Sequence, residues 1–152
     1  MKWILEGDDV LAKNLGVKVP INWSEFSEDI FKFSLDAINQ NPHSKVWYTY
    51  LPIDIKSNTI IGTCGFKGGP KNGSVEIGYE VSKVFRNKGY ATEMVNQLIN
   101  IAFNNKEVRN IIAHTLPEEN ASVSVLKKCG FVYKKEIMDD EDGKLWRWKL
   151  RK

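Results

Sequence analysis

The sequence predicts an α+β fold, in which a mixed and mostly antiparallel sheet is flanked by helices. Two observations indicate this class. Short segments with alternating apolar residues recur along the chain, and turns join most of them to the next. In the middle of the chain a helical segment instead separates two such strands, which implies one parallel crossover. With 152 residues the chain is long enough to bury a core, and we expect a single domain over residues 1–152.

The first third of the chain predicts two helices. Residues 2–15 form an amphipathic pattern that ends at Gly16. A second helix is expected to begin at Asn22, because a glutamate follows three residues later as in a capping box, and to end near Asn41. Its apolar positions fall on one stripe: Trp23, Phe26, Ile30, Phe33 and Ala37.

The following segments predict an antiparallel meander of three strands. Aromatic and β-branched residues fill the first strand, and strict alternation marks the third. In the second strand, Gly62 and Gly65 indicate kinks or close approaches of the backbone. The strands are expected at residues 45–51, 59–67 and 74–81.

The last part of the chain alternates helices with strands. Its first strand is expected to lie parallel to the strand at 74–81, because a helix connects the two. Gly130 is the expected C-terminal glycine of a short helix, and the last two strands form a hairpin around an acidic turn. The expected ranges are 88–104 and 120–128 for the helices and 108–115, 131–138 and 144–150 for the strands.

The composition excludes several function classes. A net charge of +3 is too small to indicate nucleic-acid binding, no apolar run is long enough for a membrane span, and the first residues do not form a signal peptide. Cys64 and Cys129 fit no metal or redox motif. We therefore expect two free thiols in a reducing cytoplasm, and no metal site.

The segment at residues 81–92 joins a strand to a helix through a basic loop that contains one glycine. The first N–H groups of a helix have no internal partner and favour an anion, and Gly89 allows close approach or a positive φ. This arrangement suits a diphosphate, although an ordinary connection with solvated basic residues fits the spacing equally well. A P-loop and a dinucleotide fingerprint fit worse, because each needs residues that are missing around Gly89.

Two motifs resemble the GNAT superfamily of acetyl-CoA-dependent N-acetyltransferases. Arg86-Asn87-Lys88-Gly89-Tyr90-Ala91 resembles the family's Arg/Gln-x-x-Gly-x-Gly/Ala loop. Residues 117–131 resemble its Asn-x-x-Ser…Val-Leu-x-Lys-x-Gly-Phe block, in the form typical of ribosomal-protein N-terminal acetyltransferases. The resemblance covers residues 59–132, about half of the chain, with both motifs in order and at family spacing.

The resemblance implies acetyl-CoA as cosubstrate and assigns residues to it. The pantetheine arm would lie along Tyr79, Glu80 and Val81, and the N–H of Val81 would face the thioester oxygen. The second block adds Asn120 and Ser122, although the family's asparagine falls on Glu119 here, so Asn120 either replaces that contact or caps a helix. The pyrophosphate would be held by Arg86, Asn87, Lys88, Gly89, Tyr90, Ala91 and Thr92.

Glu76 is the best candidate for the general base, since it resembles a strand glutamate that some family members use. Partial burial is expected to raise its pKa. Glu80 and His114 are the alternatives, and both glutamates could also be solvated strand residues. As a lone histidine on an inner strand, His114 is expected to be packed with one backbone partner. No general acid can be carried over, because Lys127 stands where many relatives have a tyrosine.

We therefore expect an N-acetyltransferase that moves the acetyl group directly from acetyl-CoA to a primary amine of a small molecule or a protein N-terminus. A non-catalytic acyl-CoA-binding regulatory domain and a nucleotide-binding protein that shares only the loop are the alternatives. Family members usually begin with a strand, and none is visible before the first helix. Its absence would leave the neighbouring strand exposed or paired with a second subunit in a homodimer.

Overall fold

The computed structural model describes residues 2–26 and 28–152, which fall into two compact units. Unit 1 contains the described residues up to Gly65 together with Tyr79–Tyr90. Unit 2 contains Phe66–Gly78 and Ala91–Lys152. Strand β5 (Ser74–Val81) runs from unit 2 into unit 1, so each unit contains part of it.

Unit 1 combines helices with short strands. A small core forms around Leu11, Trp23, Phe31 and Ile60. Its helices are α1 (Lys2–Leu5), α2 (Asp8–Leu15), α3 (Glu28–Gln40) and the 3-10 turns η1 (Pro42–Trp47) and η2 (Lys83–Phe85). Its strands are β1 (Thr49–Tyr50), β2 (Ile53–Asp54), β3 (Thr59–Ile60) and most of β4 (Gly62–Phe66).

The first predicted helix is divided in two. Gly7 adopts a φ of 111°, outside the helical range, and separates α1 from α2. The predicted stop is confirmed, because Gly16 is left-handed with a φ of 66° and its N–H donates to the carbonyl of Ala12.

The predicted start of the second helix is wrong. Asn22 has a φ of 53°, and α3 begins only at Glu28; Ser27, inside the predicted helix, lies outside the described residues. Trp23 precedes the helix, because its ring is buried in the core and its Nε1 donates to Asp8 Oδ1 at 2.9 Å. The predicted apolar stripe is also wrong, because α3 buries Phe31 and Ser34 and exposes Ile30 and Phe33.

The predicted meander is present, with shorter strands. Residues 45–47 belong to η1, so β1 has only two residues, and its partner is β4. A break at Ile61 separates β3 from β4. The predicted close approaches are confirmed: a Cβ on Gly62 would lie 2.2 Å from the carbonyl oxygen of Glu80, and one on Gly65 would lie 2.4 Å from that of Tyr48.

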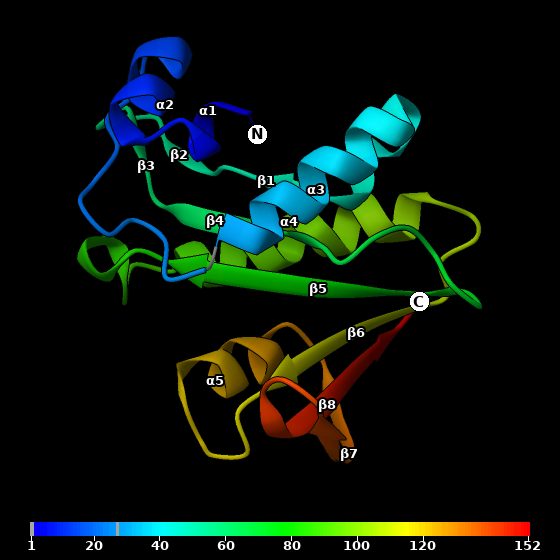
Figure 1. The fold of residues 1–152 in the computed structure, drawn as a ribbon. Helices are drawn as coiled ribbons and strands as arrows, with labels where there is room; N and C mark the ends of the chain where they lie inside the picture. The colour runs from blue at the N-terminus through cyan, green and yellow to red at the C-terminus, as the bar shows by residue number, and fades with distance from the viewer. Residues whose placement is uncertain (1, 27) are drawn as a thin grey trace. The chain divides into compact units, whose positions relative to one another are not determined.

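Unit 2 contains the parallel crossover that the sequence predicts. Helix α4 (Tyr90–Asn104) leads from β5 to β6 (Asn110–Thr115), and these two strands pair in parallel. After α5 (Ala121–Lys128), the strands β7 (Val132–Asp139) and β8 (Gly143–Arg151) form the predicted hairpin, with β8 antiparallel to β6 (Figure 1). Asn120 caps α5, and Gly130 has the expected positive φ.

Hydrogen bonding follows the order β1-β4-β5 in unit 1 and β5-β6-β8-β7 in unit 2. The β1–β4, β6–β8 and β7–β8 pairs are antiparallel and the β5–β6 pair is parallel, so the predicted α+β class with a mixed, mostly antiparallel sheet is confirmed. Within residues 2–26, no strand precedes α1, and Lys18 makes a single parallel bridge to Thr59. The predicted homodimer stays a prediction.

Candidate active site

The segment Arg86–Thr92, called here the α4-entry segment, joins η2 to α4. Gly89 has a φ of 86°, which L-residues rarely adopt, and a Cβ there would meet no atom within 4 Å. Glycine is therefore needed for the backbone angle and not for space. Asn87 precedes it at a φ of 61°, and α4 begins directly afterwards at Tyr90. The first turn of α4, whose N–H groups have no partner within the helix itself, follows directly.

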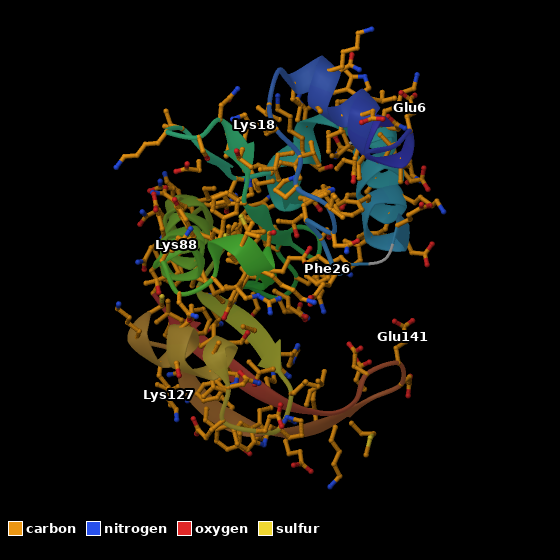
Figure 2. All side chains as sticks on the ribbon, turned by 90° about the vertical axis from the view of Figure 1, so that its left-hand side faces the viewer. Glu6, Lys18, Phe26, Lys88, Lys127 and Glu141 are labelled. Atoms are coloured by element: carbon orange, nitrogen blue, oxygen red, sulfur yellow. The ribbon has the colours of Figure 1, made fainter. Side chains whose placement is uncertain are left out.

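The cations near this segment already have protein partners. Arg86 donates from Nη2 to Glu25 Oε1 at 3.3 Å and from Nε to the carbonyl of Val81 at 3.0 Å. Lys83 lies 3.4 Å from the same Glu25 oxygen. Lys88, labelled in Figure 2, donates to the carbonyl of Val84 at 3.1 Å. Their side chains are engaged within unit 1.

Glu80 is held by neutral donors from unit 1. Its Oε2 accepts the backbone N–H of Glu25 at 2.9 Å. Its Oε1 accepts the hydroxyl of Ser24 in a short hydrogen bond and that of Thr63 at 3.3 Å. The contacts from Ser24 and Glu25 tie the segment before α3 to the last residues of β5. Sequence reasoning missed these two contacts because the partners lie more than fifty residues apart.

The last residues of β5 lie beyond its parallel ladder with β6. That ladder joins Ser74–Glu76 to Asn110–Ile112, so it covers only the first three residues of β5. Tyr79 and Val81, assigned to acetyl-CoA by the resemblance, follow on the same strand.

Glu76 lies in unit 2 and accepts hydrogen bonds from two basic side chains at one oxygen. Lys67 Nζ lies 2.7 Å from its Oε1, and His114 Nδ1 lies 3.1 Å from the same atom. Burial alone would raise the pKa of Glu76, but the hydrogen bonds from His114 and Lys67 outweigh it and hold this pKa below its usual range. The expectation of a raised pKa is therefore wrong, because the sequence did not show these two partners.

His114 differs from its prediction as well. We expected a packed histidine with a backbone partner, whereas its Nδ1 contacts the Glu76 carboxylate. Its side chain is 16% exposed, and its Nε2 is buried with no hydrogen-bond partner among the residues that the structure describes. Sequence reasoning could have found Lys67, which faces Glu76 across the predicted hairpin: its N–H donates to the Glu76 carbonyl at 3.0 Å.

The second motif, residues 117–131, contains the whole of α5. Asn120 Oδ1 accepts a hydrogen bond from the N–H of Val123 at 3.0 Å. Of its two predicted roles, a CoA contact or a helix cap, Asn120 therefore has that of the N-cap of α5. Ser122 is the second residue of the helix. Lys127, labelled in Figure 2, pairs with Glu119 at 2.7 Å.

The two cysteines are free and separate. Cys64 is buried, and burial raises its pKa to about 12. Burial also raises the pKa of Cys129. Within residues 2–26 and 28–152, no cluster of three or more His, Cys, Asp or Glu side chains could hold a metal ion, and no helix has the length and apolar character needed to cross a membrane.

The sequence matches known acetyltransferases. The family model described as "Acetyltransferase (GNAT) domain" matches residues 5–132. The chain is 32% identical over 128 residues to "Uncharacterized N-acetyltransferase YjdG" of Bacillus subtilis (strain 168), an alignment that covers 82% of this chain and 76% of that protein.

Solved structures with less than 25% identity show the same fold. Ribosomal-protein-S5-alanine acetyltransferase from Vibrio fischeri matches with a TM-score of 0.67 at 20% identity, over 77% of this chain and 67% of that one. A variant of the spermidine N-acetyltransferase SpeG from Vibrio cholerae has a TM-score of 0.64 at 18% identity, over 80% and 75%. An acetyltransferase from Salmonella typhimurium, yncA, solved with its cofactor acetyl-CoA, has a TM-score of 0.55 at 17% identity, over 62% and 60%.

Proposed function

Because the chain belongs to the GNAT acetyltransferase family, we propose that it moves an acetyl group from acetyl-CoA directly to a primary amine of a small molecule or of a protein N-terminus. The observation that carries this proposal is the α4-entry segment. Gly89 at a φ of 86° turns the backbone immediately before a helix of fifteen residues, whose first N–H groups suit the pyrophosphate of CoA.

The backbone of the α4-entry segment holds the pyrophosphate in this proposal. Arg86 can add to the site by exchanging Glu25 for a phosphate oxygen. This exchange has a low energetic cost, because Arg86 and Glu25 are about half exposed and such surface pairs contribute about 0–1 kcal/mol. Phosphate offers Arg86 a stronger, charge-assisted partner.

The thioester is placed along β5. The pantetheine arm runs beside Tyr79, Glu80 and Val81, where amide groups of the extended strand can bond it. The N–H of Val81 stabilises the oxyanion that develops on the thioester carbonyl. Asn120 and Ser122 are the candidates of the second motif for a contact with CoA, and Asn120 uses its side-chain oxygen in the cap of α5.

The reaction needs a neutral amine. The acceptor loses a proton, its nitrogen attacks the thioester carbon, and the CoA thiolate leaves. Removal of the proton depends on the Glu76 carboxylate, which lies at hydrogen-bond distance from His114 on β6. Glu76 is 28% exposed in its side chain, so it is partly shielded from water.

Two assays test the proposal in sequence. In a thermal-shift series, CoA at about a hundred times its dissociation constant should stabilise the fold by roughly 2.7 kcal/mol, and ATP should not. A panel that contains polyamines, amino acids and peptides with free N-termini should then release CoA thiol with at least one acceptor. No shift at millimolar CoA would remove the cofactor assignment, and a CoA shift without turnover on any amine would favour the regulatory-domain alternative.

A further inference from the structure

Unit 2 contains a cluster of ionisable side chains built around Glu76. Lys67 follows β4, Glu76 lies on β5 and His114 on β6, and both basic groups contact the same carboxylate oxygen. Glu76 pairs with Ile112 in the parallel ladder, and His114 lies two residues further on the same face of β6. Three elements distant in sequence therefore supply one compact cluster.

The carboxylate determines which nitrogen of His114 carries the proton. A carboxylate that is ionised at neutral pH can only accept hydrogen bonds, and the lowered pKa of Glu76 keeps it ionised there. At 3.1 Å from Glu76, His114 Nδ1 must therefore be the donor. A neutral imidazole with its proton on Nδ1 presents the lone pair of Nε2 as an acceptor.

Nε2 is a buried atom of the cluster with unused hydrogen-bonding capacity. It is buried, and no residue in the described ranges offers it a partner. An unpaired buried polar atom is unfavourable, so a donor that reaches Nε2 would be bound favourably. Glu76 Oε1, by contrast, already accepts hydrogen bonds from Lys67 and His114, which makes that oxygen a poor acceptor for a third proton.

We propose that His114 Nε2 takes the proton from the acceptor ammonium, directly or through one water, and that Glu76 is a positioning residue that fixes the imidazole tautomer and stabilises the imidazolium. This inference rests on the proposed function and assigns the base within it. Glu76 stays ionised throughout, as the carboxylate of a Ser-His-Asp triad does.

The proton transfer balances without any further reactant. One N–H bond of the ammonium breaks and one N–H bond forms at Nε2. The neutral amine attacks the thioester carbon, the C–S bond breaks, and the second proton of the amine goes to the departing thiolate. The imidazolium then returns its proton to water.

Further charged groups lie around the pair of Glu76 and His114. Lys67 contacts the same carboxylate oxygen as His114. Arg147 on β8 lies opposite His114 in the β6–β8 ladder. Asp139, at the end of β7, is a second carboxylate within electrostatic reach: its pKa is lowered first by the backbone N–H groups of Asp142 and Glu141, and further by Lys67 and His114.

The tautomer can be measured without any substrate. The chain has two histidines, His43 and His114, so a two-bond ¹H–¹⁵N spectrum contains two imidazole patterns, and His43→Gln identifies the one from His114. At a pH where this ring is neutral, wild type should show the proton on Nδ1. In Glu76→Gln the amide can donate to Nδ1, so the pattern should change to the Nε2–H tautomer. An Nε2–H pattern in wild type would overturn the proposal.

The kinetic test compares His114→Asn with Glu76→Gln. His114→Asn keeps an N–H donor near the Nδ1 position and removes Nε2, so its kcat should fall as far as that of Glu76→Gln, by about 10²–10⁴ at pH 7. The double variant should be no slower than either single variant, because the two residues act as a unit. His43→Gln is the matched control and should keep wild-type turnover.

The result that would overturn the assignment is His114→Asn within about threefold of wild type while Glu76→Gln is slow, because Glu76 would then be the base itself. Stabilisation of each variant by CoA shows that it is folded. Failure of the proposed function can be distinguished from failure of this assignment. In the first case wild type would acetylate no amine, and the tautomer measurement would still show how Glu76 and His114 are arranged.

Discussion

Two carboxylates on β5, four residues apart, have different surroundings. Glu80, in unit 1, accepts hydrogen bonds from two hydroxyls and a backbone N–H. Glu76, in unit 2, accepts from a lysine and a histidine. In the sequence the two residues look alike, since both occupy polar positions of the same alternating strand.

This difference in surroundings indicates a structural role for Glu80 and a role in proton transfer for Glu76. Neutral donors fix the Glu80 side chain and tie the segment before α3 to β5. The partners of Glu76 are titratable, and one of them has a second nitrogen with no partner in the described residues. Contacts between groups that exchange protons are typical of active sites, whereas saturated contacts to neutral donors are typical of scaffolds.

The largest expected effect distinguishes these two carboxylates. Glu76→Gln should lower turnover by roughly 10²–10⁴ at pH 7 with nearly unchanged CoA affinity, because the shape is kept and the charge is lost. At high pH the rate should recover, since the acceptor amine, with an ordinary pKa near 10.4, no longer needs a base. Steady-state kinetics across pH measure this.

Glu80→Gln is the matched variant for that comparison. It should lower the free energy of unfolding by about 1–2 kcal/mol, through weakened hydrogen bonds to Ser24 and Thr63, and should reduce turnover far less than Glu76→Gln. Denaturant unfolding and kinetics on both variants decide the matter. Equal losses of turnover would show that the two carboxylates do not differ in role.

The next effect concerns CoA affinity. Because the cations near the α4-entry segment already have partners, the backbone should contribute most of the phosphate binding. Gly89→Val forces a β-branched residue to a φ of 86°, a strain of about 1–3 kcal/mol, and should weaken CoA binding about tenfold or more. Lys88→Ala removes an exposed charge and should cost about 1 kcal/mol or less. Calorimetric titration measures both, and the reverse order would show that side chains hold the phosphates.

A smaller effect should appear in stability against pH. The pKa of Glu76 is lower in the folded chain than in the unfolded one, so its contribution to stability is complete above the unfolded pKa and is lost as the pH falls through the folded value. The free energy of unfolding of wild type should therefore decrease on acidification below about pH 4.5, more steeply than that of Glu76→Gln. Identical acid limbs in urea titrations at several pH values would contradict the contacts of Glu76.

The smallest effect is expected at the cysteines. Direct transfer needs no thiol, and burial raises the pKa of Cys64 to about 12, which suppresses the nucleophilic thiolate. Cys64→Ser and Cys129→Ser should each keep turnover within about threefold of wild type. Mass spectrometry of the quenched wild-type protein should find neither cysteine acetylated during turnover, and an acetyl-cysteine intermediate would disprove direct transfer.

Local pattern was enough to predict much of the fold. The alternation in residues 74–81 gave the bounds of β5, and the order of strand, helix and strand predicted its parallel pairing with β6. The positive φ of Gly89 and the cap at Asn120 also follow from residue type and position. These features depend on neighbours within a few residues, which the sequence shows directly.

Features that depend on distant contacts were not predictable in the same way. Asn22 and Glu25 have capping-box spacing, but Trp23 packs in the core and the Glu25 N–H bonds to Glu80, so the helix starts later. The contact of Glu76 with His114 needs the register between β5 and β6. The crossover predicts that these strands are parallel, but it does not predict their register. Without the register, the contact with His114 and the direction of the Glu76 pKa shift could not be predicted.

The most direct test of the account is the product balance of wild type with acetyl-CoA and a responsive amine at neutral pH. Free CoA thiol and acetylated amine should form in equal amounts, with each product absent when either substrate is omitted. Glu76→Gln at the same pH should form both products more slowly, and still in equal amounts. Thiol release without acetylated amine, or CoA binding with neither product on any amine of the panel, would contradict the assignment as an N-acetyltransferase.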